Sequence, residues 1–180
     1  MRIIGGEKRG TKLLSPNTDA IRPTEDRIKE NMFNLLGPIQ GSLVLDAFAG
    51  SGALGLEALS RGAEKVYFCE KNKESYQCLK ANIEKISLKG YTMYYGDVYD
   101  AIKGYREAFD LVFFDPPYKE MTAYWNLARK LREENLLKDG ARLVFERNQD
   151  LEACEDFQLL KSKRYGKKWI DIYQWSRKWR

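Results

Sequence analysis

Residues 45–55 read LDAFAGSGALG and join a short apolar run to a segment with helical periodicity. Gly50, Gly52 and Gly55 satisfy the spacing G-x-G-x-x-G. Glycines at these positions let the backbone turn sharply and approach a ligand closely. The helix that follows presents free backbone N–H groups and the positive end of its dipole, which suit a pyrophosphate or a carboxylate. The stretch therefore indicates a strand–loop–helix unit that binds an adenosine-containing cofactor.

Strand and helix patterns alternate along the chain after this loop begins. We expect strands at 43–48, 65–70, 91–95, 109–115 and 141–146, and helices at 51–61, 73–88, 98–105 and 122–137. This alternation indicates an α/β fold with a parallel sheet that is covered on both faces. Residues 157–163 and 169–175 read as two strands joined through 164–167, so the sheet should finish with an antiparallel hairpin.

The length of 180 residues suits one domain. We divide it into basic N-terminal strands or a hairpin at 1–23, an N-terminal helix at 24–37 and a catalytic core at 41–180. Thr24 is placed to cap that helix, and Glu25 and Asp26 lie in its first turn.

Composition excludes several classes of protein. No stretch approaches the roughly 20 apolar residues of a membrane span, and the N-terminus lacks a signal-peptide core, so we expect a cytoplasmic protein. Cys69, Cys78 and Cys154 show no Cys-x-x-Cys spacing, which predicts reduced packing residues instead of disulfides or a zinc site. Histidine is absent, which excludes a Ser-His-Asp relay and histidine metal ligands. We expect no metal.

Charge is concentrated at the two ends of the chain, whose net charge is +5. Residues 1–12 hold four basic residues and one acid, and residues 161–180 hold eight basic residues and one acid. An acidic body with basic ends favours a polyanionic partner such as a nucleic acid. Termini that are simply solvated are the alternative.

Acidic residues after the first three strands refine the cofactor. Glu70 ends a strand where an acid commonly binds ribose hydroxyls, which fits both NAD and S-adenosylmethionine (AdoMet). Asp46 would repel a pyrophosphate but could hold the α-amino group of AdoMet. Asp97 could accept from the adenine amino group, although Gly96-Asp97 is also an ordinary turn. The expected cofactor residues are Asp46, Phe48, Gly50, Ser51, Gly52, Glu70, Lys71, Asp97 and Val98.

The most specific motif is DPPY at residues 115–118, directly after the strand at 109–115. An aromatic amine is a poor nucleophile and must be held by hydrogen-bond acceptors before it can attack a methyl group. Asp115 and the Pro116 carbonyl supply such acceptors, and neither Pro116 nor Pro117 has an N–H. The Tyr118 ring can stack on an extruded base. We predict these four residues as the catalytic set, against the alternative of a rigid Pro-Pro turn.

With these motifs the sequence resembles the bacterial 16S ribosomal RNA guanine-N2 methyltransferases of the RsmD family. The resemblance spans nearly the whole chain and rests on RIIGG (2–6), RG (9–10), RPT (22–24), DR (26–27), LDAFAGSGALGLEA (45–58) and DPPY (115–118). It implies a Rossmann-like seven-stranded AdoMet-dependent methyltransferase sheet, AdoMet as cofactor and the guanine amino group of 16S rRNA in the small ribosomal subunit or its assembly intermediate as substrate.

The resemblance also implies which residues contact RNA. It places Arg22 and Thr24 near the active site and the basic N-terminal strands on RNA, giving the expected RNA-binding residues Arg2, Lys8, Arg9, Lys12, Arg22 and Thr24. Ala47 and Thr11 depart from the family pattern. The first should alter packing only, and the second puts one phosphate contact in doubt.

Three alternatives stay open. An adenine-N6 methyltransferase on RNA or DNA, or an enzyme methylating protein glutamine, would use the same tetrapeptide. An NAD-dependent oxidoreductase would use the glycines but leave Asp46 and the Pro-Pro loop unexplained. A non-enzymatic RNA chaperone would use only the charged ends. We expect a monomer without membrane contact.

Overall fold

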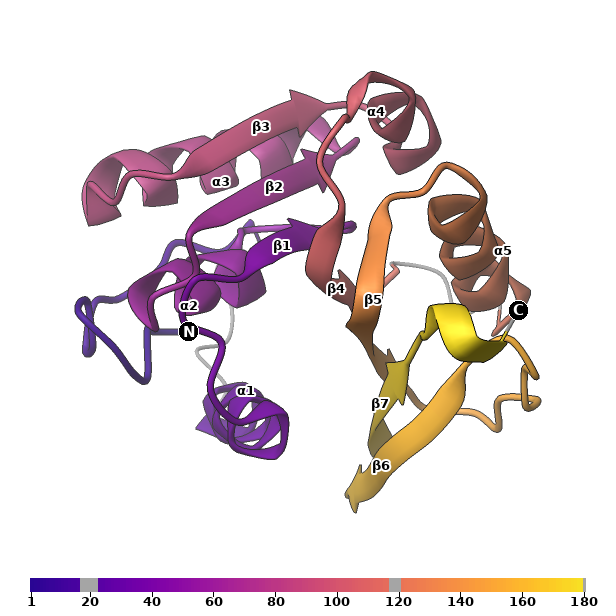
Figure 1. Cartoon of the computed structure of the whole chain (residues 1–180). Coiled ribbons are helices and arrows are strands. Elements are labelled where there is room, and N and C mark those ends of the chain that lie inside the picture. Colours follow the sequence, from indigo (N-terminus) through magenta and orange to yellow (C-terminus); the bar gives the residue numbers. More distant parts are fainter. Residues whose placement is uncertain (17–22, 117–120, 180) are drawn as a thin grey trace.

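The computed structural model describes residues 1–16, 23–116 and 121–179 of the chain. It contains a seven-stranded sheet in the order β3-β2-β1-β4-β5-β7-β6 (Figure 1). The strands are β1 Leu43–Asp46, β2 Lys65–Glu70, β3 Tyr91–Tyr95, β4 Phe109–Phe114, β5 Leu137–Arg147, β6 Gln158–Tyr165 and β7 Lys168–Gln174. The first five are parallel, and β7 is antiparallel to both β5 and β6. The predicted α/β sheet with a C-terminal antiparallel hairpin is therefore confirmed.

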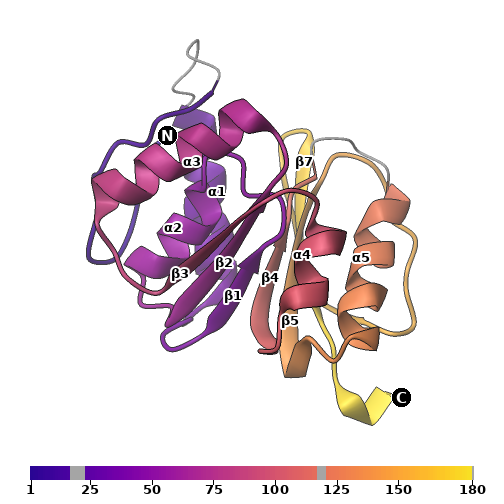
Figure 2. The same cartoon turned by 90° about the horizontal axis from the view of Figure 1, so that it is seen from above.

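Helices cover both faces of this sheet (Figure 2). They are α1 Pro23–Leu36, α2 Ala53–Ser60, α3 Lys73–Ile86, α4 Val98–Gly104 and α5 Met121–Glu133, and a short 3-10 helix follows at Arg177–Trp179. The first three lie on one face and α4 and α5 on the other. Alternate strand residues divide between two cores because successive side chains point to opposite faces. Val44 faces the α1–α3 side and Leu45 the α4–α5 side, and both are fully buried.

The first sixteen residues form a hairpin-like loop with one isolated antiparallel bridge, between Arg2 and Lys12, instead of regular strands. Some of their backbone N–H groups bond within the loop, as that of Ile3 does to the Thr11 carbonyl, but others bond to side chains of the rest of the domain, which interrupts the ladder. The N–H groups of Ile4 and Gly5 donate to Glu57 at 2.9 and 2.8 Å. Ile3 is fully buried and anchors the loop to the core.

Glu57 is the centre of a buried ionic cluster. Its carboxylate is fully buried and lies 3.1 Å from the Lys29 ammonium and 2.8 Å from the Arg61 guanidinium. Burial lowers the pKa of Lys29, although the charge of Glu57 opposes this effect. Removing one partner from such a cluster leaves an uncompensated buried charge, so the cluster fixes α1, α2 and the N-terminal loop to one another.

The predicted cap of α1 and the predicted boundary between α5 and β5 were wrong. Helix α1 begins at Pro23, whose fixed φ suits a first helical position, so Thr24 lies within the first turn and does not precede it. Helix α5 ends at Glu133 and β5 starts at Leu137, where we expected a helix over 122–137 and a strand over 141–146. Asn135, with φ of 57°, turns the chain out of the helix. The carbonyl of Leu136 then accepts from the Phe109 N–H at 2.8 Å, which draws this segment into the sheet.

The remaining elements start and end within two residues of the predicted positions. The β6–β7 connection is shorter than expected. It consists of Gly166 and Lys167 alone, and Gly166 adopts φ of 62°, a conformation that a tight hairpin turn requires.

Candidate active site

A cavity of about 620 Å³ opens at the carboxyl ends of the parallel strands. Its size is that of a small-molecule or cofactor site. Residues of three strand–helix connections line one part, which we call the loop half: Phe48, Gly50, Ser51, Glu70, Lys71, Asn72, Asp97 and Val98. Residues from strand ends and from α1 line the other part, which we call the strand-end half: Glu25, Lys29, Met32, Asp115, Glu146 and Lys168.

The glycine loop adopts the backbone that its sequence predicts. Gly50 and Gly52 have φ of 56° and 84°, values that other residues rarely adopt. A Cβ on Gly55 would lie 2.2 Å from a ring carbon of Phe68 in β2. The third glycine therefore allows α2 to pack closely on the sheet, and the first two form the turn above it.

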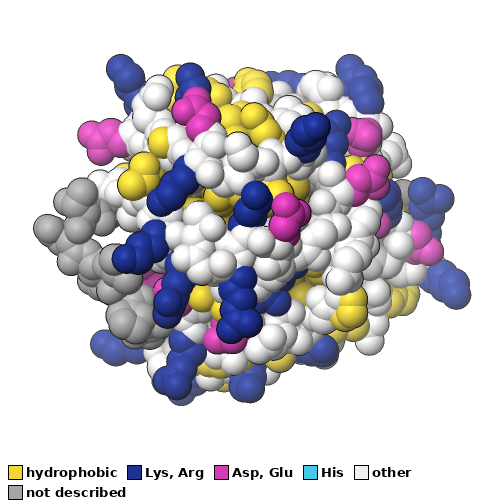
Figure 3. Space-filling model, turned by 90° about the vertical axis from the view of Figure 1, so that its left-hand side faces the viewer, with side chains coloured by type: hydrophobic (Ala, Val, Ile, Leu, Met, Phe, Trp, Pro, Cys, Tyr) yellow, Lys and Arg dark blue, Asp and Glu magenta, His cyan; other side chains and the backbone are white. Residues whose placement is uncertain are grey.

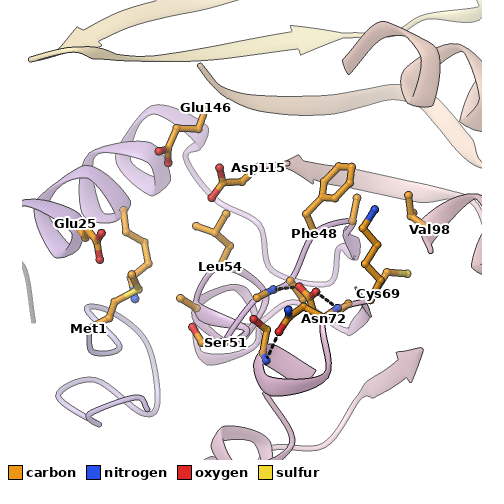
Figure 4. A pocket seen from close by; sticks show the side chains of 18 of the residues that line it. Met1, Glu25, Phe48, Ser51, Leu54, Cys69, Asn72, Val98, Asp115 and Glu146 are labelled. Carbon is orange, nitrogen blue, oxygen red and sulfur yellow. Dashed lines mark hydrogen bonds between the residues drawn. The ribbon is translucent and has the colours of Figure 1, made fainter. Parts of the chain in front are cut away.

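Glu70 braces this loop from the end of β2. One carboxylate oxygen accepts from the Gly50 N–H at 2.7 Å and the other from the Asn72 N–H at 2.6 Å (Figure 4). Asn72 in turn caps α3 by accepting from the Ser75 N–H at 3.0 Å. Each carboxylate oxygen has a second lone pair. Glu70 can therefore order the loop and still accept from a ligand hydroxyl.

Asp97 comes two residues after the end of β3. Its carboxylate caps α4 by accepting from the Tyr99 N–H at 2.9 Å, and the Lys71 ammonium is 3.7 Å away. Val98 beside it is buried, at 3% exposure, and forms an apolar wall of the cavity together with Phe48. The loop half thus combines an apolar slot with the carboxylate acceptors of Glu70 and Asp97.

Asp46 lies beneath this surface and does not line the cavity. Its side chain is buried and accepts from the Gly55 N–H at 3.0 Å. Burial raises the pKa of Asp46 to about 7, the Gly55 hydrogen bond lowers it and the charge of Glu70 raises it. Gly52 also lies outside the lining. A direct contact of Asp46 with a cofactor stays a prediction.

The tetrapeptide predicted to be catalytic is described in part. Asp115 is exposed and lines the cavity directly after β4, followed by Pro116. Pro117 and Tyr118 lie outside the described residues. Because Asp46 pairs with Phe113, the end of β4 lies beside the end of β1, from which the glycine loop starts. The structure therefore brings Asp115 and the glycine loop to one cavity, as the sequence predicted.

Five residues of the strand-end half were not predicted from the sequence. They are Glu25, Lys29 and Met32 from α1, Glu146 from β5 and Lys168 from β7. Lys168 donates to the Glu146 carboxylate. Burial lowers the pKa of Lys168, but the charges of Glu146, Asp115 and Glu25 outweigh burial and raise it. Figure 4 shows Glu146 and Asp115 next to each other, with Glu25 facing the same space.

The predicted RNA-binding residues are distributed along the N-terminal loop. Lys8 and Arg9 lie at its tip, where the Lys8 N–H donates to Ser60 at the end of α2. Eight-residue α2, about 12 Å long, separates this tip from the glycine loop. Figure 3 shows Lys and Arg side chains spread over this side of the molecule. Arg2 and Lys12 are exposed on the two arms of the loop, Arg22 lies outside the described residues, and the side chain of Thr24 is not described.

Other expected features can be located as well. The three cysteines are free, and Cys69 and Cys154 are buried. Within residues 1–16, 23–116 and 121–179, no three or more Cys, Asp or Glu residues are grouped in a way that could hold a metal ion. None of the described helices is long and apolar enough to cross a membrane.

Comparison with known proteins gives matches over nearly the whole chain. The family model described as Conserved hypothetical protein 95 matches residues 1–174. The Haemophilus influenzae protein named ribosomal RNA small subunit methyltransferase D is 41% identical over 97% of this chain and 93% of its own length. A Bacillus subtilis protein with the provisional name rRNA methyltransferase YlbH is 34% identical over 97% and 98%. A solved Escherichia coli structure, whose title suggests a methyltransferase, is 30% identical and superposes with a TM-score of 0.83 over 98% of each chain.

Proposed function

Because the chain belongs to the family described as Conserved hypothetical protein 95, we propose that it transfers a methyl group from AdoMet to the exocyclic N2 amino group of a guanine in small-subunit ribosomal RNA. The observation that carries the proposal is that Asp115 and the glycine loop line one cavity. A methyl donor and an amine acceptor must meet in line, and a shared cavity permits this meeting.

The loop half fits AdoMet better than a dinucleotide. Glu70 has free lone pairs for ribose hydroxyls, and Asp97 and Val98 border the slot that suits an adenine ring. The N–H groups at the start of α2 suit a carboxylate. A pyrophosphate would face the carboxylates of Glu70 and Asp97 with Lys71 as the only neighbouring cation of the loop half. When bound, AdoMet supplies an electrophilic methyl group attached to a sulfonium sulfur.

Asp115 and the Pro116 carbonyl hold the acceptor amine in this proposal. Two acceptors on the amino hydrogens orient the nitrogen lone pair toward the methyl carbon and draw it out of conjugation with the ring. A carbon–nitrogen bond forms as the carbon–sulfur bond breaks, and the electron pair of the broken bond stays on sulfur. The nitrogen then loses one proton, which Asp115 accepts. Positioning supplies most of the acceleration, and the chemistry requires no metal.

The proposed partner is 16S rRNA within the small ribosomal subunit or its assembly intermediate. We also propose that the protein is a monomer and acts in the cytoplasm. The relatives named as rRNA methyltransferases support an RNA substrate. The exposed basic N-terminal loop supplies charge for phosphate contacts.

Transfer of tritium from labelled AdoMet to small subunits of a strain that lacks this enzyme tests the proposal. We expect label in N2-methylguanosine at one position, identified by nucleoside chromatography. Calorimetric titration with AdoMet, S-adenosylhomocysteine and NADH tests the cofactor. Binding of NADH alone, or label in adenosine, would refute the proposal.

A further inference from the structure

Three adjacent strands present an acid, a second acid and an amine to the strand-end half of the cavity. Phe114 of β4 pairs with Phe145 of β5, so the next residues, Asp115 and Glu146, lie side by side on one face of the sheet. Glu146 pairs with Ile170 of β7. Lys168, two residues before Ile170, is therefore the diagonal neighbour of Glu146 on the same face. The order across the sheet is Asp115, Glu146, Lys168.

This order matches the functional groups on the base-pairing edge of guanine. That edge carries the N2 amino group and the N1–H, both donors, and then the O6 acceptor. Two carboxylates and one ammonium are their complements, in the same sequence. Adenine presents an acceptor at N1, which would face the Glu146 carboxylate and be repelled. The arrangement therefore favours guanine over adenine in two ways, because it attracts the donors and the acceptor of guanine and repels the N1 acceptor of adenine.

Burial and charge make Glu146 and Lys168 suited to this task. The Glu146 side chain is 14% exposed and that of Lys168 is 41% exposed, so their ion pair borders the cavity and is not deeply buried in the core. The negative charges of Asp115 and Glu25 add to that of Glu146 in raising the pKa of Lys168, so its ammonium stays charged at this partly buried position. Hydrogen bonds between charged groups and a base are strong where water is excluded. A preformed pair also loses little entropy on binding.

We propose that Glu146 and Lys168 determine the base specificity of the site, with Glu146 accepting from guanine N1–H and Lys168 donating to O6 while Asp115 holds the N2 amino group. This inference rests on the proposed function and names the residues that select its base. A purely structural ion pair would support transfer to any 2-amino base equally, which gives the test its readout.

The test exchanges the target guanine for 2-aminopurine, which keeps the amino group but lacks N1–H and O6. Once tritium mapping has identified the target nucleotide, small subunits are reconstituted with either base there. We expect the wild-type enzyme to prefer guanine by at least about 50-fold in kcat/KM. We expect Glu146→Ala to reduce the preference to below about 5-fold, with Lys168→Met between the two.

The partly exposed pair Lys130 and Glu134, joined at 2.7 Å on the α5 side, supplies matched controls. Glu134→Ala and Lys130→Met should keep the wild-type preference. Calorimetric binding of AdoMet shows that each variant is folded. Retention of the wild-type preference by both cavity variants, whatever their absolute rates, would overturn the inference. Failure of the wild-type enzyme to label any guanine would instead refute the proposed function.

Discussion

The two halves of the cavity are built in different ways. In the loop half, backbone N–H groups and short side chains are fixed by bonds within consecutive segments, as Gly50 is held by Glu70 and α3 by Asn72. In the strand-end half, long side chains converge from β4, β5, β7 and α1, which are far apart in sequence. The first construction gives a rigid cradle for a constant ligand. The second allows the acceptor to be selected by individual side chains on a shared scaffold.

The largest expected effect separates the two halves directly. Asp115→Ala should lower kcat by about 1,000-fold or more, because the amine loses the carboxylate that orients it and takes its proton. AdoMet affinity should stay unchanged, because the loop half is intact. Tritium transfer and calorimetry measure the two quantities, with the fully exposed Asp150→Ala as control. An active Asp115→Ala enzyme would show that this carboxylate does not hold the acceptor amine.

The reciprocal change is Glu70→Ala, which should weaken AdoMet binding by about 10- to 100-fold. Affinity falls because the variant loses both the proposed contact of Glu70 with the ligand and the hydrogen bonds by which Glu70 holds Gly50 and Asn72. Glu64→Ala is the control, since Glu64 is an exposed acid directly before the first residue of β2. Calorimetry should show the weaker binding, and saturating AdoMet should restore most of kcat. Wild-type affinity in Glu70→Ala would show that the loop needs no brace.

A third test concerns the acid beneath the loop. The pKa of Asp46 is about 7 when folded, against 3.8 as its ordinary value. The native state thus binds the proton more tightly, and the stability gained from neutral Asp46 is lost as the pH rises toward 7. Asp46→Asn cannot ionise, so without ligand its Tm should rise relative to wild type by about 5 °C between pH 5 and pH 8.

Differential scanning fluorimetry across that pH range measures this difference. Exposed Asp150→Asn should follow the wild type at every pH. A constant difference between Asp46→Asn and wild type would mean that the raised pKa does not fall within this pH range.

The smallest expected effect lies outside both halves. Arg9→Glu at the tip of the N-terminal loop should weaken binding to small subunits by about 3- to 10-fold at low salt, and the loss should shrink as salt increases. Filter binding at several salt concentrations measures it, with exposed Arg106→Glu on the α4 side as control. Equal affinities at low salt would exclude the tip from the RNA contact.

The same contrast explains what the sequence could predict. The glycine loop, Glu70 and Asp97 could be placed at one edge of the sheet from the sequence, because each lies at or just after the end of its strand and the local pattern determines the geometry. The membership of the family confirms the resemblance that these motifs suggested. Glu146 and Lys168 carry no local signal, because only the pairing of β4, β5 and β7 brings them to Asp115.

The misplaced boundary at β5 has a similar cause. Helical periodicity continues through Leu136 and Leu137, but pairing of Leu137 with Phe109 takes this segment into the sheet. Tertiary hydrogen bonds here override local propensity. The buried cluster of Glu57, Lys29 and Arg61 was also invisible, since Glu57 reads as an ordinary helical acid until the N-terminal loop folds onto it.

Met1 is part of the cavity wall, and its carbonyl accepts from the Leu13 N–H at 2.9 Å. A purification tag fused ahead of Met1 would therefore extend from the wall of this cavity. It would compete with the substrate for entry. The opposite end of the chain emerges on the α5 side (Figure 1). An affinity handle joined there leaves the entrance clear, and assays on preparations tagged at the two ends should not be pooled.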